Sequence, residues 1–295
     1  MKVLLTCMDC LQENRIPDLH PVVMTLNDDR LFKSTCPNGH QTLTSIQEPK
    51  YEVLFELGMN ALVDGYPREA VTSFASSLES FYEFCFNQVS LYKGVDRKSL
   101  DAGWKYIAKQ SERQLGAFVM LWLNYFGSAP TLLSNNCRRF RNNVVHNGYI
   151  PELDEALIFG DNIVACVASN LRDMKRHLGD DLGEIFLSEF FTRAQSQDQR
   201  ITTLSVPMTI SWARLVENEA VDLRARLDSI NKGRVIFQWP KFYPLVLGKR
   251  GFLIDTMRSQ LNLLGLVSNG PLQGILFVFL RRWQLFGMRV APERR

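Results

Sequence analysis

Apolar residues recur with a helical period through the middle of this chain of 295 residues. The pattern begins with Val53, Leu54, Leu57, Ala61 and Leu62. Spacings of three and four residues place apolar side chains on one face of an α-helix, so a helix is predicted from Pro49. The turn-forming sequence Gly65-Tyr66-Pro67 interrupts the pattern, and a second helix is predicted from Arg68 to about Val89. The two segments are expected to form a helical hairpin.

Three more helices are predicted after this hairpin. The first runs from about Leu100 to Phe126, the second from about Leu132 to His146, and the third from Pro151 to about Leu178. Acidic residues at the start of the third helix suit the positive end of its dipole. The pattern predicts an antiparallel bundle of about five helices.

The helical pattern weakens after Gly179. Residues 181–231 are predicted to be helical in parts, including an amphipathic segment from Ile210 to Leu227, whereas 201–206 is equally compatible with a strand. Beyond Lys232 we expect mixed strand, loop and helix. The apolar residues 277–285 suit either an interface or a core.

Composition and charge change this picture little. The chain is 46% hydrophobic and has a formal net charge of +3, so its bulk charge does not identify a nucleic-acid binder. Contacts with RNA would depend on local patches, such as Arg138 with Arg139 or Lys105 with Lys109. The start of the chain is not typical of a signal peptide, and the apolar run 274–280 is shorter than the about 20 residues that span a bilayer. We expect a cytoplasmic protein that does not contact a membrane.

Four of the residues that bind soft metals form two closely spaced pairs. Cys7 and Cys10 form the first pair, and Cys36 and His40 form the second. Such pairs, separated by an insert containing the apolar run 22–26, are typical of a zinc ribbon, and four ligands complete a tetrahedral structural zinc site with no open position.

The remaining cysteines and histidines are weaker candidates for this site. Cys85, Cys137 and Cys166 lie in apolar helical contexts, which favours a packing role. His20 is an alternative to His40 as the fourth ligand, although its position between two prolines favours a loop residue. Gly39 would allow the tight turn between Cys36 and His40.

The helix predicted before residue 147 ends in a second chemical pattern, Arg141-Asn142-x-x-x-His146. An arginine binds a phosphate through several fixed donors, whereas a histidine can accept and return a proton near neutral pH. On a helix Asn142 lies directly beneath His146, and Arg141 flanks them and reaches His146 through its long side chain. The alternative is a solvated basic face on a helix that ends at Asn147.

This pattern and its sequence context resemble the HEPN superfamily (higher eukaryotes and prokaryotes nucleotide-binding). The resemblance rests on the segment 137–151 and on the two segments 55–66 and 68–84, which resemble the first helical hairpin of that family. It covers roughly residues 50–178. It implies a small helical bundle that dimerises and brings two Arg-His motifs into one ribonuclease site.

The resemblance implies a role for each motif residue. His146 would activate the ribose 2′-hydroxyl or protonate the leaving 5′-oxygen, Arg141 would hold the scissile phosphate, and Asn142 would orient the imidazole or the phosphate. The expected product is a 2′,3′-cyclic phosphate. The resemblance also suggests an accessory role for Glu79, whose alternative is a surface or bundle-edge glutamate. Tyr149 either stacks on a base or packs on the bundle, and we favour packing.

Together these patterns predict a mainly α protein of three regions: a small β zinc ribbon (1–46), a HEPN-like antiparallel helical bundle (47–179) and a mixed C-terminal region of uncertain fold (180–295). The expected function is that of a metal-independent endoribonuclease, of the toxin or phage-defence kind. Its expected partners are RNA, a second copy of the chain, and an inhibitor or activator protein. The alternative is a catalytically silent scaffold that binds RNA or protein.

Overall fold

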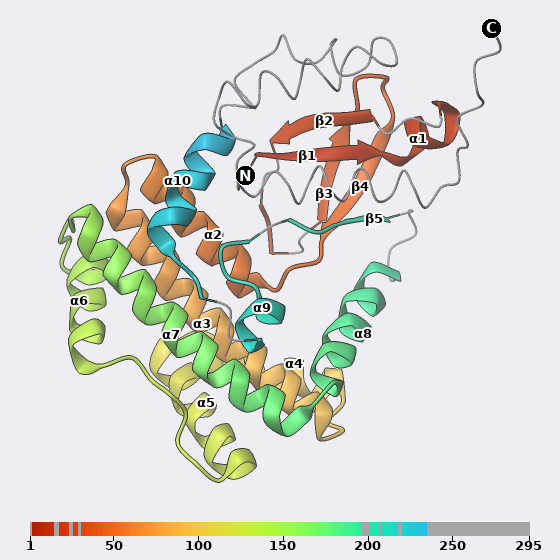
Figure 1. The fold of residues 1–295 in the computed structure, drawn as a ribbon. Helices are drawn as coiled ribbons and strands as arrows, with labels where there is room; N and C mark the ends of the chain where they lie inside the picture. The colour runs from red at the N-terminus through yellow and green to blue at the C-terminus, as the bar shows by residue number, and fades with distance from the viewer. Residues whose placement is uncertain are drawn as a thin grey trace, which may run out of the picture. The chain divides into compact units, whose positions relative to one another are not determined.

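The computed structural model describes residues 2–14, 18–23, 26–28, 31–195, 201–206, 208–217 and 220–234. The chain divides into two compact units, Met1–Leu227 and Asp228–Arg295. The first unit is mainly helical, as predicted (Figure 1). The expectations for residues beyond 234, including the apolar run 277–285, lie outside the described residues.

The helix α3 (Pro67–Tyr92) is the centre of the helical part. The helices that pack against it are α2 (Lys50–Val63), α4 (Arg97–Ile107), α5 (Ser111–Phe126), α6 (Asn135–His146), α7 (Leu153–Leu178) and α8 (Asp181–Gln195). The predicted hairpin of α2 and α3 is confirmed, and the turn between them contains Gly65 at a φ of 79°. None of the described helices is both long enough and apolar enough to cross a bilayer.

Aromatic side chains fill the core around α3. The ring of Phe55 on α2 lies 4.5 Å from that of Phe74 on α3, and the ring of Tyr82 lies 4.6 Å from that of Phe118 on α5. A methyl group at Gly58 would lie 2.5 Å from the Phe74 ring. Gly58 therefore permits the close approach of α2 and α3.

The single helix predicted over 100–126 is wrong, because two helices, α4 and α5, occupy this segment. The chain leaves the helical conformation at Gln110, whose φ of −138° and ψ of 125° are extended. Side chains from the first turn of α5 satisfy carbonyl groups at the end of α4: Arg113 donates to Tyr106 O at 3.2 Å and Gln114 donates to Ala108 O at 2.7 Å. Polar side chains make these capping bonds, and they leave the spacing of the apolar residues unchanged. The hydrophobic pattern of the sequence therefore does not reveal the break between the two helices.

The helices that flank residue 147 begin at recognisable caps. Ser134 Oγ accepts a hydrogen bond from Cys137 N at 3.2 Å, so α6 begins three residues later than predicted. Glu152 and Glu155 form a capping box at the start of α7. The buried Asn170 side chain holds the backbone of Thr131, accepting from its N–H at 3.0 Å and donating to its carbonyl at 2.8 Å. The loop before α6 is thereby attached to α7.

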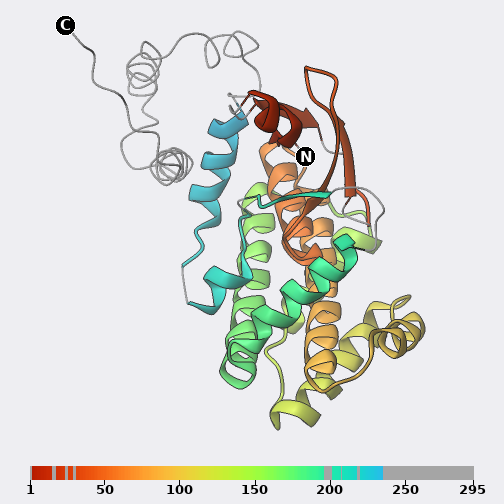
Figure 2. The same cartoon turned by 90° about the vertical axis from the view of Figure 1, so that its right-hand side faces the viewer.

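Short strands form two small sheets at one end of the helices (Figure 2). The strands are β1 (Lys2–Cys7), β2 (Asp18–Val23), β3 (Leu31–Thr35), β4 (Gln41–Ile46) and β5 (Ile201–Leu204). The helix α1 (Met8–Asn14) lies between β1 and β2 in the sequence. β1 pairs antiparallel with β2, and β3 pairs antiparallel with β4. β5 pairs parallel with β4, so the strand alternative for 201–206 is the observed one. Phe32, Ile46, Val53 and Met208 form a small core between this sheet and α2.

Three buried glutamates on α2 and just before it hold the segment that follows β5. Glu48 accepts from Val206 N at 2.8 Å, Glu52 from Trp212 N at 2.7 Å, and Glu56 from Thr209 N at 2.7 Å. The segment continues into α9 (Trp212–Val216) and α10 (Leu223–Arg234), so the helix predicted from 210 to 227 is interrupted. Glu52 and Glu56 lie four residues apart on one side of α2, whereas Glu48 lies on the bend before Pro49.

Candidate functional site

The helix α6 presents the Arg-His pattern at its C-terminal end. Val144 is buried beneath it, whereas Asn142 and His146 are exposed and Arg141 is half-buried. His146 is the last residue of the helix, and Gly148 turns the chain with a φ of 73°.

The guanidinium of Arg141 connects three side chains. Nη2 donates to Glu79 Oε1 on α3 at 2.5 Å, while Nη1 donates to Asn142 Oδ1 at 3.0 Å and lies 3.4 Å from His146 Nε2. Arg141 thus reaches around the helix to His146, as expected from its length. No hydrogen bond joins Asn142 to His146 within the described part of the chain, so the two helical neighbours meet through Arg141.

The role of His146 in its contact with Arg141 depends on the tautomer of the imidazole. A guanidinium has only donors, so the contact is a hydrogen bond when Nε2 of His146 carries no proton. Nε2 of His146 faces the guanidinium of Arg141, so a group that can accept a proton lies beside a group that can bind an anion.

Glu79 fixes the position of Arg141 from the neighbouring helix. The side chains of Arg141 and Glu79 have exposed fractions of 21% and 31%, so their ion pair is partly shielded from water. Burial raises the pKa of the Glu79 carboxyl above its ordinary value, and Arg141 offsets only part of this effect. The charge of Glu112, at the start of α5, raises the pKa further, which brings the α4–α5 junction into the electrostatic surroundings of the pair.

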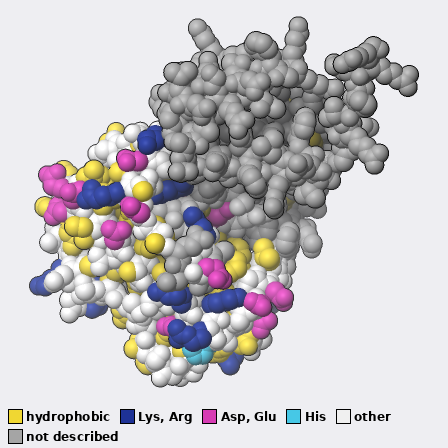
Figure 3. All heavy atoms as spheres, viewed as in Figure 1, with side chains coloured by type: hydrophobic (Ala, Val, Ile, Leu, Met, Phe, Trp, Pro, Cys, Tyr) yellow, Lys and Arg dark blue, Asp and Glu magenta, His cyan; other side chains and the backbone are white. Residues whose placement is uncertain are grey.

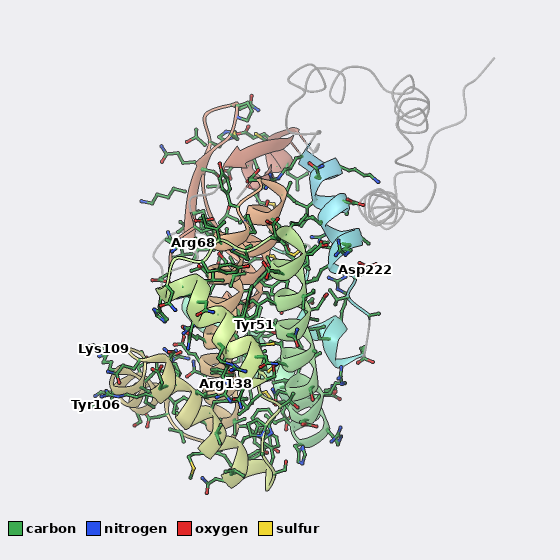
Figure 4. The ribbon with its side chains drawn as sticks, turned by 90° about the vertical axis from the view of Figure 1, so that its left-hand side faces the viewer. Tyr51, Arg68, Tyr106, Lys109, Arg138 and Asp222 are labelled. Atoms are coloured by element: carbon green, nitrogen blue, oxygen red, sulfur yellow. The ribbon has the colours of Figure 1, made fainter. Side chains whose placement is uncertain are left out.

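Two more arginines of α6 lie exposed beside this network. Arg138 and Arg139 donate to Asn135 and Asn136, respectively, each at 2.5 Å. Figure 4 shows Arg138 on α6, in front of the helices of the core. These two side chains supply positive charge near Arg141 without contacting His146.

Tyr149 lies on the turn that follows His146. Its hydroxyl donates to both carboxylate oxygens of Glu155, at 3.1 and 2.9 Å, and its ring contacts Phe140 edge-on. The hydrogen bond to Glu155 raises the pKa of the Tyr149 hydroxyl. The residue therefore ties the end of α6 to α7, which agrees with the packing role favoured above.

A second cluster, of three thiols and one imidazole, lies at the meeting point of the two small sheets. Cys7 ends β1, Cys10 lies on α1, and Cys36 and His40 flank the turn between β3 and β4. The ligand atoms of all four lie within 4.8 Å of one another, so this cluster could bind a metal ion. The ligand pairs thus come from a strand end with a helix and from a hairpin turn, in which Gly39 has a φ of 89°.

The distances within this cluster fit tetrahedral coordination. Cys10 Sγ lies 3.7 Å from Cys36 Sγ, and His40 Nδ1 lies 3.7, 3.2 and 3.6 Å from the sulfurs of Cys7, Cys10 and Cys36. Bond lengths of about 2.3 Å for Zn–S and about 2.05 Å for Zn–N predict edges of about 3.8 and about 3.6 Å. The side chain of His20, the alternative ligand on β2, lies outside the described residues.

Neighbouring groups support the donor set. Nε2 of His40 lies 3.3 Å from Glu13 Oε1, which leaves Nδ1 for a metal, and Asn38 Nδ2 donates to Cys10 Sγ at 3.2 Å. Burial alone raises the pKa of the Cys36 thiol, but hydrogen bonds from the backbone of His40 and Asn38 outweigh it and lower the pKa. These are the contacts that stabilise a thiolate ligand.

Sequence reasoning missed Glu13, Asn38 and the glutamates at 48, 52 and 56. Asn38 lies inside the Cys36–His40 turn, so its position offered a signal. Glu13 is distant in sequence from His40 and offered none. The spacing of Glu52 and Glu56 on one helical face was a signal, because charged residues that share the apolar side of a helix must find partners.

Comparison of this chain with protein-family models, with curated proteins and with solved structures gives no match.

Proposed function

We propose that this protein is a metal-independent endoribonuclease of the HEPN type, with a structural zinc site in its N-terminal region. The observation that carries the proposal is the Arg141 guanidinium, which contacts both the exposed His146 and the positioning carboxylate of Glu79. A base and an anion-binding group in contact are what phosphodiester transfer to the ribose 2′-oxygen requires.

The proposed reaction requires a His146 whose Nε2 carries no proton. Of the five N–H donors of Arg141, three make the contacts described, so two remain for the scissile phosphate. His146 Nε2 takes the proton of the 2′-hydroxyl, the 2′-oxygen bonds to phosphorus, and the bond from phosphorus to the 5′-oxygen breaks. A protonated His146 gives its proton to that oxygen, leaving a 2′,3′-cyclic phosphate and a 5′-hydroxyl. Asn142 keeps the guanidinium beside the imidazole.

A second copy of the chain would complete this site. The resemblance implies a composite site with two Arg-His pairs, in which one histidine acts as base and the other as acid. Large apolar side chains are exposed close to the His146 end of α6: Ile150 is 71% exposed and Ile158 is 59% exposed. Covering such side chains is a favourable contribution to dimerisation.

The metal cluster has a separate, structural role in this proposal. Three cysteines and one histidine fill a tetrahedral zinc shell, so no position remains for a substrate or an activated water. A bound zinc ion would hold α1 against the β3–β4 hairpin. The region before α2 is too short to fold on its hydrophobic core alone, so the free energy of metal binding would contribute to its folding.

Cleavage of RNA without divalent cations tests the proposed function. Purified protein is incubated with total cellular RNA in magnesium-free buffer with EDTA, the product ends are mapped, and bound zinc is measured in parallel. His146→Ala is the test variant. Arg176→Ala is the control, because Arg176 is an exposed arginine in the last turn of α7 and is paired with Asp173 at 3.0 Å.

We expect discrete fragments with cyclic phosphate ends from the wild type and from Arg176→Ala, and loss of about 100-fold or more of this activity in His146→Ala. Cleavage by His146→Ala at the wild-type rate would refute the assignment of His146. Absence of cleavage by a dimeric, zinc-loaded wild type would favour the scaffold alternative.

A further inference from the structure

The outer face of α4 carries a line of lysines. Leu100, Trp104 and Ile107 face α3, and Phe86 of α3 lies 5.2 Å from the Trp104 ring. At about 100° per residue, Lys98 and Lys105 lie about 140° to 160° from Leu100, on the opposite side of the helix. Ala108 keeps a helical backbone, so Lys109 continues the same line, which is about 16 Å long.

The acidic residues of this helix do not neutralise the line. Asp96 is occupied as the N-cap, where it accepts from Ser99 N and Ser99 Oγ at 3.0 and 2.6 Å. Asp101 lies three residues after Lys98 and four before Lys105, and its carboxylate is paired with Arg97 at 2.9 Å. Charges elsewhere are more mixed: Figure 3 shows basic and acidic side chains interspersed over the described part of the face seen in Figure 1.

An aromatic side chain lies beside these lysines. Tyr106 is 79% exposed, more than any other large hydrophobic residue of the described chain. Its backbone is fixed, because its carbonyl accepts from Arg113 at 3.2 Å. Figure 4 places Tyr106 and Lys109 together at the outer end of the α4–α5 hairpin. An exposed ring beside cations is an arrangement on which an unpaired base stacks.

The same hairpin borders the Arg-His network. The helices α4 and α5 and the helix α6, which carries Arg141 and His146, all pack against α3. An RNA strand bound along the lysine line can therefore continue over the same central helix to the scissile-phosphate position.

We propose that Lys98, Lys105, Tyr106 and Lys109 form a docking surface for single-stranded RNA that flanks the cleaved bond. The lysines contact consecutive phosphates, and the Tyr106 ring stacks on a base without selecting its identity. The proposal deepens the proposed function, from which it takes RNA as the ligand. Its contacts are independent of the cleavage chemistry.

Binding measurements on a non-cleaving background test this surface. A fluorescein-labelled single-stranded RNA of about 20 nucleotides is titrated with His146→Ala protein at salt concentrations from about 50 to about 200 mM. The test variants add Lys105→Ala with Lys109→Ala, or Tyr106→Ala, and Tyr106→Phe keeps the ring. The control adds Lys175→Ala with Arg176→Ala, which removes the same charge at the end of α7, where His177 contacts the far end of α5.

The double lysine variant should lower the slope of log K against log salt by about 1.4, since each lost phosphate contact on a single strand contributes about 0.7. Tyr106→Ala should weaken binding about fivefold or more, and Tyr106→Phe should bind like the parent. The control should keep the parent slope.

An unchanged slope and affinity in the test variants would overturn the docking surface, even if the wild type cleaves RNA. Weakened binding in these variants together with a wild type that does not cleave would refute the proposed function and leave the surface intact. Lysine-dependent binding to phosphatidylserine vesicles, with no RNA binding, would assign the surface to a membrane and overturn the proposal.

Discussion

Nη1 of Arg141 lies 3.4 Å from Nε2 of His146, although the two residues differ by 140° around α6. The arginine side chain closes this angle because Glu79 of α3 and Asn142 hold its other donors. Two helices therefore build the pair. Substitutions can distinguish the roles of the cation Arg141, the base His146 and the positioning carboxylate Glu79.

Arg141→Lys should abolish most cleavage although it keeps the positive charge. A lysine ammonium is a point charge that cannot contact Glu79, His146 and two phosphate oxygens at once. We expect kcat/KM to fall by about 100-fold or more, as when one transition-state donor is lost. Arg139→Lys makes the same change on an arginine outside the network and should keep full activity. Equal effects of the two substitutions would contradict a specific role for Arg141.

Glu79 should act through Arg141. Glu79→Ala removes the carboxylate that aims the guanidinium, and kcat/KM should fall by roughly tenfold. In a double-mutant cycle, Glu79→Ala should have little further effect in an Arg141→Ala background, because the contact is already lost. Glu79→Gln keeps an acceptor oxygen and should restore part of the activity. Additive losses would place Glu79 outside this network.

Sequence periodicity predicted most helices because their apolar faces are continuous. It failed between Ile107 and Ser111, where both helices keep an apolar face and side-chain capping by Arg113 and Gln114 makes the break. It also could not choose between strand and helix for 201–206, because β5 is defined by a partner far away in sequence.

In the candidate sites, too, contacts between residues close in sequence were predictable, whereas contacts between distant residues were not. Cys7 with Cys10 and Cys36 with His40 are local pairs, so their spacing predicted a cluster that the structure brings together. Arg141 and His146 lie on one helix, and their contact follows from side-chain length. Glu13, which contacts His40, and Glu79, which contacts Arg141, come from other elements of the fold. Only the packing of these elements brings each glutamate close to its partner.

Zinc should be bound at one ion per chain and should stabilise the N-terminal region. Cys36→Ser replaces a thiolate ligand by a poor one, so the protein should lose zinc and unfold at a lower temperature. Cys137→Ser changes a thiol outside the cluster and should retain the metal. Zinc content by atomic absorption and thermal unfolding followed by circular dichroism measure both effects. Full zinc content in Cys36→Ser would exclude this thiol as a ligand.

Glu13 should tune this site without being a ligand. Its carboxylate faces Nε2 of His40 and orients the ring. Glu13→Gln should therefore weaken zinc binding by about 10- to 100-fold, measured by competition with a chromogenic chelator. An unchanged affinity would show that the hydrogen-bonded hairpin turn alone fixes the ring of His40.

Glu52 should make folding stability depend on alkaline pH. Burial raises the pKa of its carboxyl from 4.5 to about 8, and the charge of Glu48 adds to this rise. The backbone N–H of Trp212, the hydroxyl of Tyr51 and the charge of Arg214 oppose it. Because the pKa in the folded state exceeds that in the unfolded state, this stabilising contribution is fully present below about pH 4.5. It is lost as pH rises through about 8.

Glu52→Gln should remove this dependence, since an amide oxygen still accepts from Trp212 N but carries no charge. Urea unfolding at about pH 6 and about pH 9 measures the effect, and the wild type should lose about 2.5 kcal/mol more than the variant between these values. Glu69→Gln changes an exposed glutamate of α3 and should behave like the wild type. If Glu52→Gln kept the full loss of folding stability at alkaline pH, this pH dependence would have to arise from another group. The contact between Glu52 and Trp212 would then not be the point at which a buried charge loosens the segment after β5.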